Sequence, residues 1–355
     1  MNSDKGQYAA DALALLKKLI AVPSVSRSET AAADVLADVM EEWGLQCRRA
    51  GNNIWIEDPY YDSSRPTLLL NAHIDTVRPS DSWTRDPYVP ELSDGRLYGL
   101  GSNDCGGGLV TLLQVFRILV PARREYNIVY LASAEEEVSG AGGVSMVLPL
   151  LPRIDVAVVG EPTGMQPAVA EKGLMVLDMT VYGRSGHAAR GEGVNAIYEA
   201  LDDLCWLRDF KFGRVSPFLG STIMTATVIN AGTQHNVVPD KCRIVVDVRT
   251  NEMYTNEEVF EIIRSGVKGE VKARSFRLNS SHIPEGHPLV RRCVEMGMRP
   301  FGSPTLSDQA LMPFPSLKLG PGDSARSHTA DEYILVSEIA DAIDIYERLL
   351  GELHL

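Results

Sequence analysis

The sequence predicts an α/β fold, with a mainly parallel sheet covered by helices on both faces and a smaller α+β domain inserted into it. Short runs of almost unbroken apolar residues are typical of strands buried on both faces, and helical patterns separate these runs. After about residue 172 the apolar residues instead alternate with polar ones, as in strands with one exposed face. These patterns recur through a chain of 355 residues, long enough for two domains.

Helices and buried strands alternate through the first half of the chain. A period of 3.6 residues predicts a helix, whereas a short unbroken apolar run predicts a buried strand. In chain order the predicted elements are helices over 8–20 and 30–43, a strand over 67–73, a helix over 107–120, and strands over 127–134 and 155–160. The same alternation of helices and buried strands resumes near the C-terminus, with a helix over 288–298, a strand over 315–320 and a helix over 335–350.

The segment between these two parts predicts a ferredoxin-like unit with an antiparallel sheet. Its order of elements is strand, helix, strand, strand, helix, strand, which is the order of that fold. The elements are expected over 174–183, 193–210, 221–230, 241–250, 256–266 and 270–278. We therefore predict a discontinuous larger domain over 1–172 and 285–355, with an inserted domain over 173–284.

Composition limits the class of function. The formal net charge of −13 argues against a nucleic-acid or anionic-membrane partner, because both require clustered Lys and Arg. The five cysteines are scattered without a CxxC pair, which predicts neither a thiolate zinc site nor a disulfide framework and fits a cytoplasmic protein. The N-terminus is typical of an amphipathic helix and not of a signal peptide, and no apolar run approaches the ~20 residues that span a bilayer.

Polar residues follow the buried strands at the edge where open parallel sheets bind their ligands. Three strands lead into "AHID", "ASAEEEVSG" and "VVGEPTG", and two Gly-rich loops, "GLGSNDCGGG" and "GPGDSARSHTADE", add further polar groups. The residues concerned are His73, Asp75, Asp104, Glu135, Glu136, Glu137, Glu161 and His328.

Each of these residues has an ordinary interpretation when taken alone, such as a helix cap or a solvated surface. The loop around Asp104 is not a dinucleotide loop, since the acid stands where the G-x-G-x-x-G pattern needs glycine. Together, however, five acids without neighbouring Lys or Arg would cost several kcal/mol in repulsion and desolvation. The acids counted are Asp75, Asp104, Glu136, Glu137 and Glu161.

Divalent metal ions would remove this cost. Imidazole and carboxylate ligands suit zinc, with cobalt or manganese as alternatives, and the set is large enough for two ions that share a bridging acid. In that interpretation the strand over 67–73 presents His73 to a metal, while Asp75 lies behind the ring and holds its tautomer.

At this point the motifs resemble those of the zinc-dependent aminoacylase, carboxypeptidase and deacylase family. The resemblance is to the branch that contains acetylornithine deacetylase and succinyl-diaminopimelate desuccinylase. The matching motifs are "HID" (73–75), "GSNDCGG" (101–107), "EEE" (135–137), "GEPTG" (160–164) and "SHTADE" (327–332), in the family's order and separations. The resemblance implies a zinc-peptidase-like catalytic domain.

The resemblance also implies roles for these residues. His73, Asp104 and Glu161 would be metal ligands with Asp104 bridging, and Glu137 and His328 would complete the two sites. Glu136 would be the general base that deprotonates the attacking water and later protonates the leaving amine. This chain departs from the family pattern at Glu135, where Asp is usual, and at Cys105, in "DCGGG" where D-M-K-G-G is commoner.

Further roles fall in the predicted insert, through which members of the family dimerise. In "GRSGHAARGEG", His187 matches the histidine that reaches the partner's active site and hydrogen-bonds the oxyanion. In "NAGTQHNVVPDKCRIVVDVR", Asn236 and Arg249 are candidates for binding a substrate carboxylate, with His235 a weaker one. The ordinary alternatives are a surface-loop histidine and an interface arginine.

The expected activity is metal-dependent removal of an acetyl or succinyl group from an amino acid, with N-acyl-ornithine in arginine biosynthesis preferred. The alternatives are a succinyl-diaminopimelate desuccinylase or a dipeptidase of the same family, and a catalytically silent zinc-binding dimeric scaffold. A metallophosphatase is disfavoured, because it would need more histidine ligands and phosphate-binding Arg or Lys.

Overall fold

A computed structural model describes residues 2–355 of the chain, with side chains from residue 6 onward. The chain divides into two compact units. The first comprises Met1–Val169, Ile283–Phe301 and Ser307–Leu355, and the second comprises Ala170–His282 and Gly302–Leu306. The expected boundaries lie within three residues of these, whereas the short return of Gly302–Leu306 to the second unit was not predicted.

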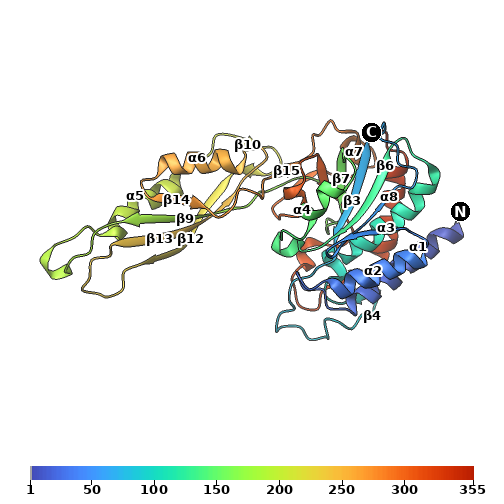
Figure 1. The fold of residues 1–355 in the computed structure, drawn as a ribbon, viewed down its shortest axis with the longest axis horizontal. Coiled ribbons are helices and arrows are strands. Elements are labelled where there is room, and N and C mark those ends of the chain that lie inside the picture. Colours follow the sequence, from blue (N-terminus) through green and yellow to red (C-terminus); the bar gives the residue numbers. More distant parts are fainter. Residues whose placement is uncertain (1) are drawn as a thin grey trace. The chain divides into compact units, whose positions relative to one another are not determined.

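The first unit contains most of a nine-stranded mixed sheet (Figure 1), in which β15 and parts of β8 and β16 belong to the second unit. Its order is β1-β2-β6-β3-β7-β17-β8-β15, with β16 paired to β8. The strands are β1 (Arg48–Ala50), β2 (Asn53–Glu57), β6 (Asn127–Ser133), β3 (Thr67–His73), β7 (Val156–Val159), β17 (Ser316–Lys318), β8 (Ala168–Glu171), β15 (Ser281–His282) and β16 (Phe301–Ser303). The four central strands β6, β3, β7 and β17 are parallel, and the strands directly beside them, β2 and β8, are antiparallel to them.

Helices cover both faces of this sheet. On one face α3 (Gly107–Leu119) packs on β3 and β6 and contacts α1 (Asn2–Ile20) and α8 (Val336–Gly351), while α2 (Thr30–Glu42) packs on α1. On the other face α4 (Val144–Val147) packs with apolar residues of the sheet, including Leu69, Val129 and Ala157. A further helix, α7 (Pro288–Glu295), contacts α8. The predicted α/β class with a mainly parallel sheet and helices on both faces is confirmed.

The central helix is apolar enough to resemble a membrane span. One stretch among the described residues, Ser102–Ala122, has the length and mean hydropathy that a bilayer crossing needs. However, 67% of it is buried inside the protein, and residues 107–116 of α3 are all buried. The apolar composition of this stretch is therefore accounted for by its place in the core.

A small three-stranded sheet adjoins the C-terminal helix. It contains β4 (Glu91–Ser93), β5 (Arg96–Tyr98) and β18 (Tyr333–Leu335), in the order β18-β5-β4. Because β18 follows the "SHTADE" loop directly and pairs with β5, it anchors the C-terminal end of that loop.

The second unit has the predicted ferredoxin-like order. The elements are β9 (Met175–Tyr182), α5 (Ala196–Asp209), β12 (Ile223–Ala231), β13 (Lys241–Arg249), α6 (Asn256–Gly266) and β14 (Glu270–Ala273), with a short β10–β11 pair (Val215–Ser216, Gly220–Ser221). The sheet order is β12-β13-β9-β14 and every pairing is antiparallel. Alternate residues of β9 and β13 are buried, as the alternating sequence pattern predicts. They pack against the buried residues of α5 and α6.

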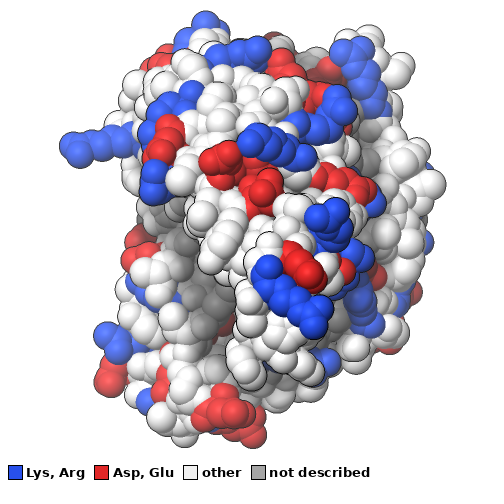
Figure 2. Space-filling model, turned by 90° about the vertical axis from the view of Figure 1, so that its left-hand side faces the viewer, with Lys and Arg blue, Asp and Glu red and all other residues white. Residues whose placement is uncertain are grey.

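Charge on the surface is mixed in sign. In the view of Figure 2, Lys and Arg side chains lie among Asp and Glu side chains over the visible face. Exposed side chains of opposite charge form ion pairs in the second unit, such as Arg274 with Asp178 and Lys268 with Asp202. Such exposed pairs contribute little to stability.

Candidate metal centre and active site

The parallel strands bring the predicted site residues to one edge of the sheet. His73 is the last residue of β3 and pairs with Ser133, the last residue of β6. Asn71 of β3 pairs with Val159, the last residue of β7. The glutamate triplet therefore begins two residues beyond β6, and Glu161 lies two residues beyond β7, at the carboxyl ends where ligands of such sheets bind.

The tautomer of His73 is set by its own loop. The ring is buried, and its Nδ1 lies 2.8 Å from the backbone carbonyl oxygen of Asp75, which can only accept a hydrogen bond. Nδ1 therefore carries a proton, which leaves Nε2, on the side of the acids, as the ring nitrogen that can bind a metal. The Asp75 carboxylate lies 3.5 Å from Nδ1, so the carbonyl, and not the predicted carboxylate, makes the closer contact.

Asp104 lies between the two histidines. Its Oδ1 is 3.3 Å from Nε2 of His73, and its Oδ2 is 3.6 Å from Nε2 of His328. Nε2 of His328 is also 3.0 Å from Oε2 of Glu137. One carboxylate with an oxygen directed to each histidine is the arrangement that a bridging ligand needs.

The remaining two acids approach His73. Oε1 of Glu161 lies 3.8 Å from its Nε2, and Oε2 of Glu136 lies 3.9 Å from it. Ligand atoms of His73, Asp104 and Glu137 all lie within 4.8 Å of one another. All seven predicted residues of the larger domain are thus gathered in the first unit: His73, Asp75, Asp104, Glu136, Glu137, Glu161 and His328.

The charge balance of this cluster fits divalent cations. Burial and the neighbouring Asp104 raise the pKa of Glu161 to about 8, and its buried Oε1 has no hydrogen-bond partner among the described residues. Burial and the nearby Glu161, Asp308 and Glu137 likewise raise the pKa of Glu136 well above its usual value. A cation bound among these oxygens would supply the missing partner and return the carboxylates to their ionised form.

The Asp75 carboxylate organises the glutamate loop. Its two oxygens accept hydrogen bonds from the backbone N–H of Glu136 (3.0 Å) and of Glu137 (3.2 Å), and from the Ser26 hydroxyl (2.7 Å). Burial alone would raise the pKa of Asp75, but His73 and these hydrogen bonds lower it below its usual value. The ionised carboxylate therefore holds the loop that carries two of the site acids.

The first glutamate of the triplet points elsewhere. Glu135 has a positive φ of 54°, and its carboxylate accepts a hydrogen bond from the N–H of Gly142 and lies 3.9 Å from Arg27. A Cβ added at Gly140 or Gly142 would collide with this side chain. The glycines of "SGAGG" thus make room for Glu135, which leaves the next two glutamates for the site.

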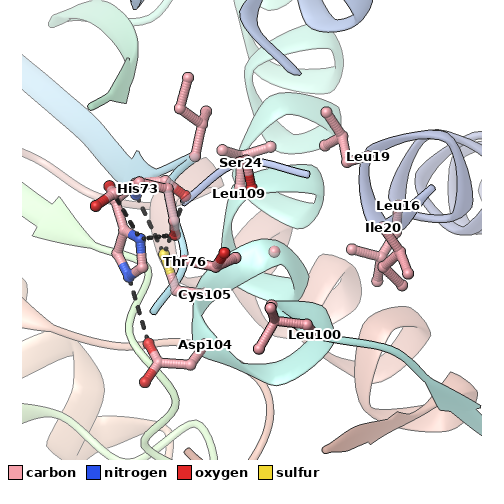
Figure 3. Close-up of a pocket in the computed structure, with 14 residues that line it drawn as sticks. Leu16, Leu19, Ile20, Ser24, His73, Thr76, Leu100, Asp104, Cys105 and Leu109 are labelled. Atoms are coloured by element: carbon pink, nitrogen blue, oxygen red, sulfur yellow. Dashed lines mark hydrogen bonds and ion pairs between the residues drawn. The ribbon is translucent and has the colours of Figure 1, made fainter. Parts of the chain in front are cut away.

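Cys105 lies behind His73. Its thiol donates to the backbone carbonyl of His73 and accepts from its N–H (Figure 3), and burial raises its pKa. The thiol also lies within 4.8 Å of ligand atoms of His73 and Glu161. The family resemblance gave Cys105 no ligand role, and here its thiol is hydrogen-bonded to the backbone at the end of β3. The adjacent cavity in Figure 3 holds about 20 Å³, enough for one water and too small for a substrate.

Sequence reasoning missed the buried polar groups below the site. The hydroxyl of Ser133 donates to Asp308 at 2.5 Å, and both residues are buried. Lys318 of β17 is buried as well, and its charge lowers the pKa of Glu161. The sequence predicted that no Lys or Arg would lie beside the clustered acids, and Lys318 shows that this prediction is wrong. The signal was present in the sequence, since a lysine within the apolar run "PSLKLG" is unusual for a buried strand.

The other predicted residues lie in the second unit. Nδ1 of His187 accepts from the N–H of Ala189, so that its Nε2 carries the proton and can donate. The carbonyl of Asn236 accepts from the N–H of Ala188, which places its backbone beside the His187 loop. Arg249 is held by Asp247 through two hydrogen bonds of 2.9 and 3.2 Å.

Fold and site together define a hydrolase-type α/β domain with candidate metal ligands at one edge of its sheet. Residues 69–352 match the family described as peptidase family M20/M25/M40, and the chain therefore belongs to this family. The predicted branch is supported by relatives. The chain is 29% identical to acetylornithine deacetylase of Proteus mirabilis, over 95% of each chain. It is 25% identical to succinyl-diaminopimelate desuccinylase 2 of Ruegeria sp., over 99% of this chain and 97% of that one.

A solved structure shows the same fold. A peptidase of the M20 family from Bacillus subtilis, described as binding a dinuclear metal, matches with a TM-score of 0.74 at 16% identity. The match covers 97% of this chain and 98% of that one.

Proposed function

We propose that this protein is a cytoplasmic, metal-dependent amidohydrolase that removes an acetyl or succinyl group from the nitrogen of an amino acid, with N-acyl-ornithine as the preferred substrate. The observation that carries the proposal is Asp104, whose two oxygens face two different histidines beside Glu136. The names of the two relatives support this substrate class.

In this proposal two divalent ions, zinc first and cobalt or manganese as alternatives, are held by five residues. These are His73, Asp104, Glu137, Glu161 and His328. When bound, such ions polarise the amide carbonyl and lower the pKa of water toward ~7.

The chain's own groups then move the proton. Glu136 takes a proton from the attacking water and delivers it to the departing nitrogen, which breaks the amide bond as the acid and the free amine form. Burial and the neighbouring acids raise the pKa of Glu136, which is the direction that favours a carboxyl group returning a proton to the leaving amine.

The test is release of ornithine from N-acetyl-ornithine and from N-succinyl-ornithine by zinc- or cobalt-loaded protein. Release from one substrate, abolished by a chelator, would support the proposal and identify the acyl group. If the protein hydrolyses neither ornithine derivative but hydrolyses N-succinyl-diaminopimelate or a dipeptide, it is a desuccinylase or a dipeptidase instead. Metal binding without any hydrolysis would favour the silent scaffold.

We further propose a homodimer formed through the second unit, with His187 of one copy donating to the oxyanion in the other. The supporting observation is an apolar surface on α5 and on β12, an edge strand of its sheet. Its exposed side chains include Tyr198, Leu201, Val228 and Ile229. Exposed apolar edge strands invite pairing with a second copy.

We also propose that Asn236 and Arg249 bind the carboxylate of the substrate. The Arg249 guanidinium already donates two hydrogen bonds to Asp247, so it would have to bind the substrate carboxylate and Asp247 together.

Two experiments test the dimer. Tyr198→Lys with Ile229→Lys should give a monomer in sedimentation velocity, whereas Tyr60→Lys, at an exposed tyrosine of the first unit, should remain a dimer. Co-expressed His187→Ala and Glu136→Gln chains should regain activity, because a mixed dimer pairs an intact Glu136 with the partner's intact histidine. No recovery in a verified mixed dimer would exclude a role for His187 across the dimer.

A further inference from the structure

Two loops of the first unit meet at the candidate metal centre. One, residues 99–106, carries Asp104, and the other, residues 320–332, carries His328. They are joined by the side chains of Asn103 and Glu332, which have no role in the proton transfers described above.

Glu332 is a buried carboxylate that gathers backbone N–H groups of the first loop. Its Oε1 accepts from the N–H of Asn103 at 2.8 Å and of Asp104 at 2.9 Å, and its Oε2 accepts from the N–H of Gly101 at 3.1 Å. Its backbone carbonyl accepts from the N–H of Gly99 at 3.0 Å. One residue of the second loop therefore holds four N–H groups of the first.

Asn103 makes the reciprocal connection. It is buried, and its Nδ2 donates to the carbonyl of Asp323 at 3.1 Å and to the Ser327 hydroxyl at 3.3 Å. Its Oδ1 accepts from the N–H of Asp323 at 3.0 Å. These contacts reach the residue directly before His328.

The two histidines differ in what supports them. His73 is the end of a central strand and is buried, whereas the His328 side chain is 54% exposed on a loop where its φ is +59°. Burying a carboxylate and an amide is costly unless every group is hydrogen-bonded. Here the bonded groups join two loops and not two packed elements, so they determine how far Asp104 lies from His328.

We propose that Asn103 and Glu332 form a clasp of positioning residues that holds Asp104 and His328 in register, so that a second metal ion can share Asp104 with the first. The clasp rests on the metal centre of the proposed function but not on its substrate. Its loss should weaken binding of the ion that needs His328 more than binding of the ion that needs His73.

The test uses the full-length protein and Co²⁺ alone, titrated by calorimetry and by visible absorption at a temperature where circular dichroism shows each variant to be folded. Wild type should bind two equivalents. Glu332→Gln and Asn103→Ala should keep the first within about threefold and weaken the second by at least tenfold, because the clasp acts on one ligand of the second ion. Asp331→Asn is the matched control, since the Asp331 carboxylate binds Thr84 and Arg85 and not the Asp104 loop.

The outcomes separate the two proposals. If both clasp variants bind two equivalents with wild-type affinities, or lose both ions equally, the clasp is overturned. If wild type binds two ions but hydrolyses no N-acyl amino acid, the proposed substrate fails while the clasp stands. If folded wild type binds fewer than two, the dinuclear centre and the clasp fail together.

Discussion

At the scale of single residues, the site is arranged by backbone groups as much as by side chains. The carbonyl of Asp75 sets the tautomer of His73, and the N–H groups of Glu136 and Glu137 are held by the Asp75 carboxylate. Asp75 therefore connects His73, a ligand in the proposed metal centre, to the loop that carries the proposed base, Glu136.

Replacing Glu136 by Gln should remove turnover and leave metal binding in place. The amide keeps the shape of the side chain but cannot accept the proton, so kcat should fall by about 10²–10⁴. Metal content measured on the purified variant should stay at the wild-type level, whereas His73→Ala should lose metal. Substantial activity in Glu136→Gln would show that another group is the base.

Asp75→Asn should lower activity without removing the ligands themselves. The amide nitrogen would face a backbone N–H, so at least one bond to the glutamate loop is lost, and the metal affinity or kcat should fall about 10–100-fold. Ser26→Ala removes only the third bond to this carboxylate and should have a smaller effect. Equal losses in the two variants would contradict a role for Asp75 in holding Glu136.

At the scale of elements, the site depends on how closely α3 approaches the end of β7. Gly108 in the first turn of α3 lies against Gly160, which immediately precedes Glu161. Any Cβ at Gly108 would collide with the carbonyl oxygen of Gly160. Gly108, in the Gly-rich segment after Asp104, is therefore required for the packing of α3 against the end of β7.

Gly108→Ala should destabilise the protein by about 1–3 kcal/mol, because the helix or the strand end must shift. Urea denaturation measures this change. Gly6→Ala is the control, since Gly6 lies in α1 with nothing within 4 Å of an added Cβ, and alanine should there be neutral or stabilising by about 0.5–1 kcal/mol. A Gly108→Ala variant as stable as wild type would mean that the contact relaxes freely.

At the scale of the whole molecule, the first unit accumulates buried acids that its own cations do not balance. Glu161 has a pKa of about 8 from burial and Asp104, and its partner-free oxygen lies beside the metal-ligand candidates. Hydrogen bonding to Glu137 raises the pKa of His328 to about 9. Both groups hold their protons more tightly in the folded state than in the unfolded chain.

Metal-stripped protein should therefore lose stability as the pH rises. For Glu161 the loss runs from its usual value near 4.5 up to about 8, and for His328 it runs from about 6.5 up to about 9. Thermal unfolding in chelator should give a Tm that falls between pH 5 and pH 8, and added Zn²⁺ should abolish most of this fall. A Tm independent of pH in chelator would contradict the charge balance described above.

The two units differ in how well the local pattern of apolar and polar residues predicted their helices and strands. In the second unit, alternation of apolar and polar residues in β9 and β13 reflects one buried face, so elements and order were predictable. In the large sheet and in the small sheet beside it, the strands β1, β2, β4, β5, β8, β15, β16 and β18 were missed. They are two to five residues long, too short to show a period, and β8, β15 and β18 pair with segments that are distant in the sequence.

The sequence by itself determined the fold class, the buried parallel strands and the acids and histidines at their ends, because burial and strand direction leave local patterns in the chain. Only the tertiary structure decided which oxygen of Asp104 faces which histidine, that Glu135 turns away into glycines, and that Lys318, Asp308, Asn103 and Glu332 support the site. These contacts join residues that are far apart in the sequence, such as Glu332 and Asn103 at a separation of 229 positions, and no local period records such a separation.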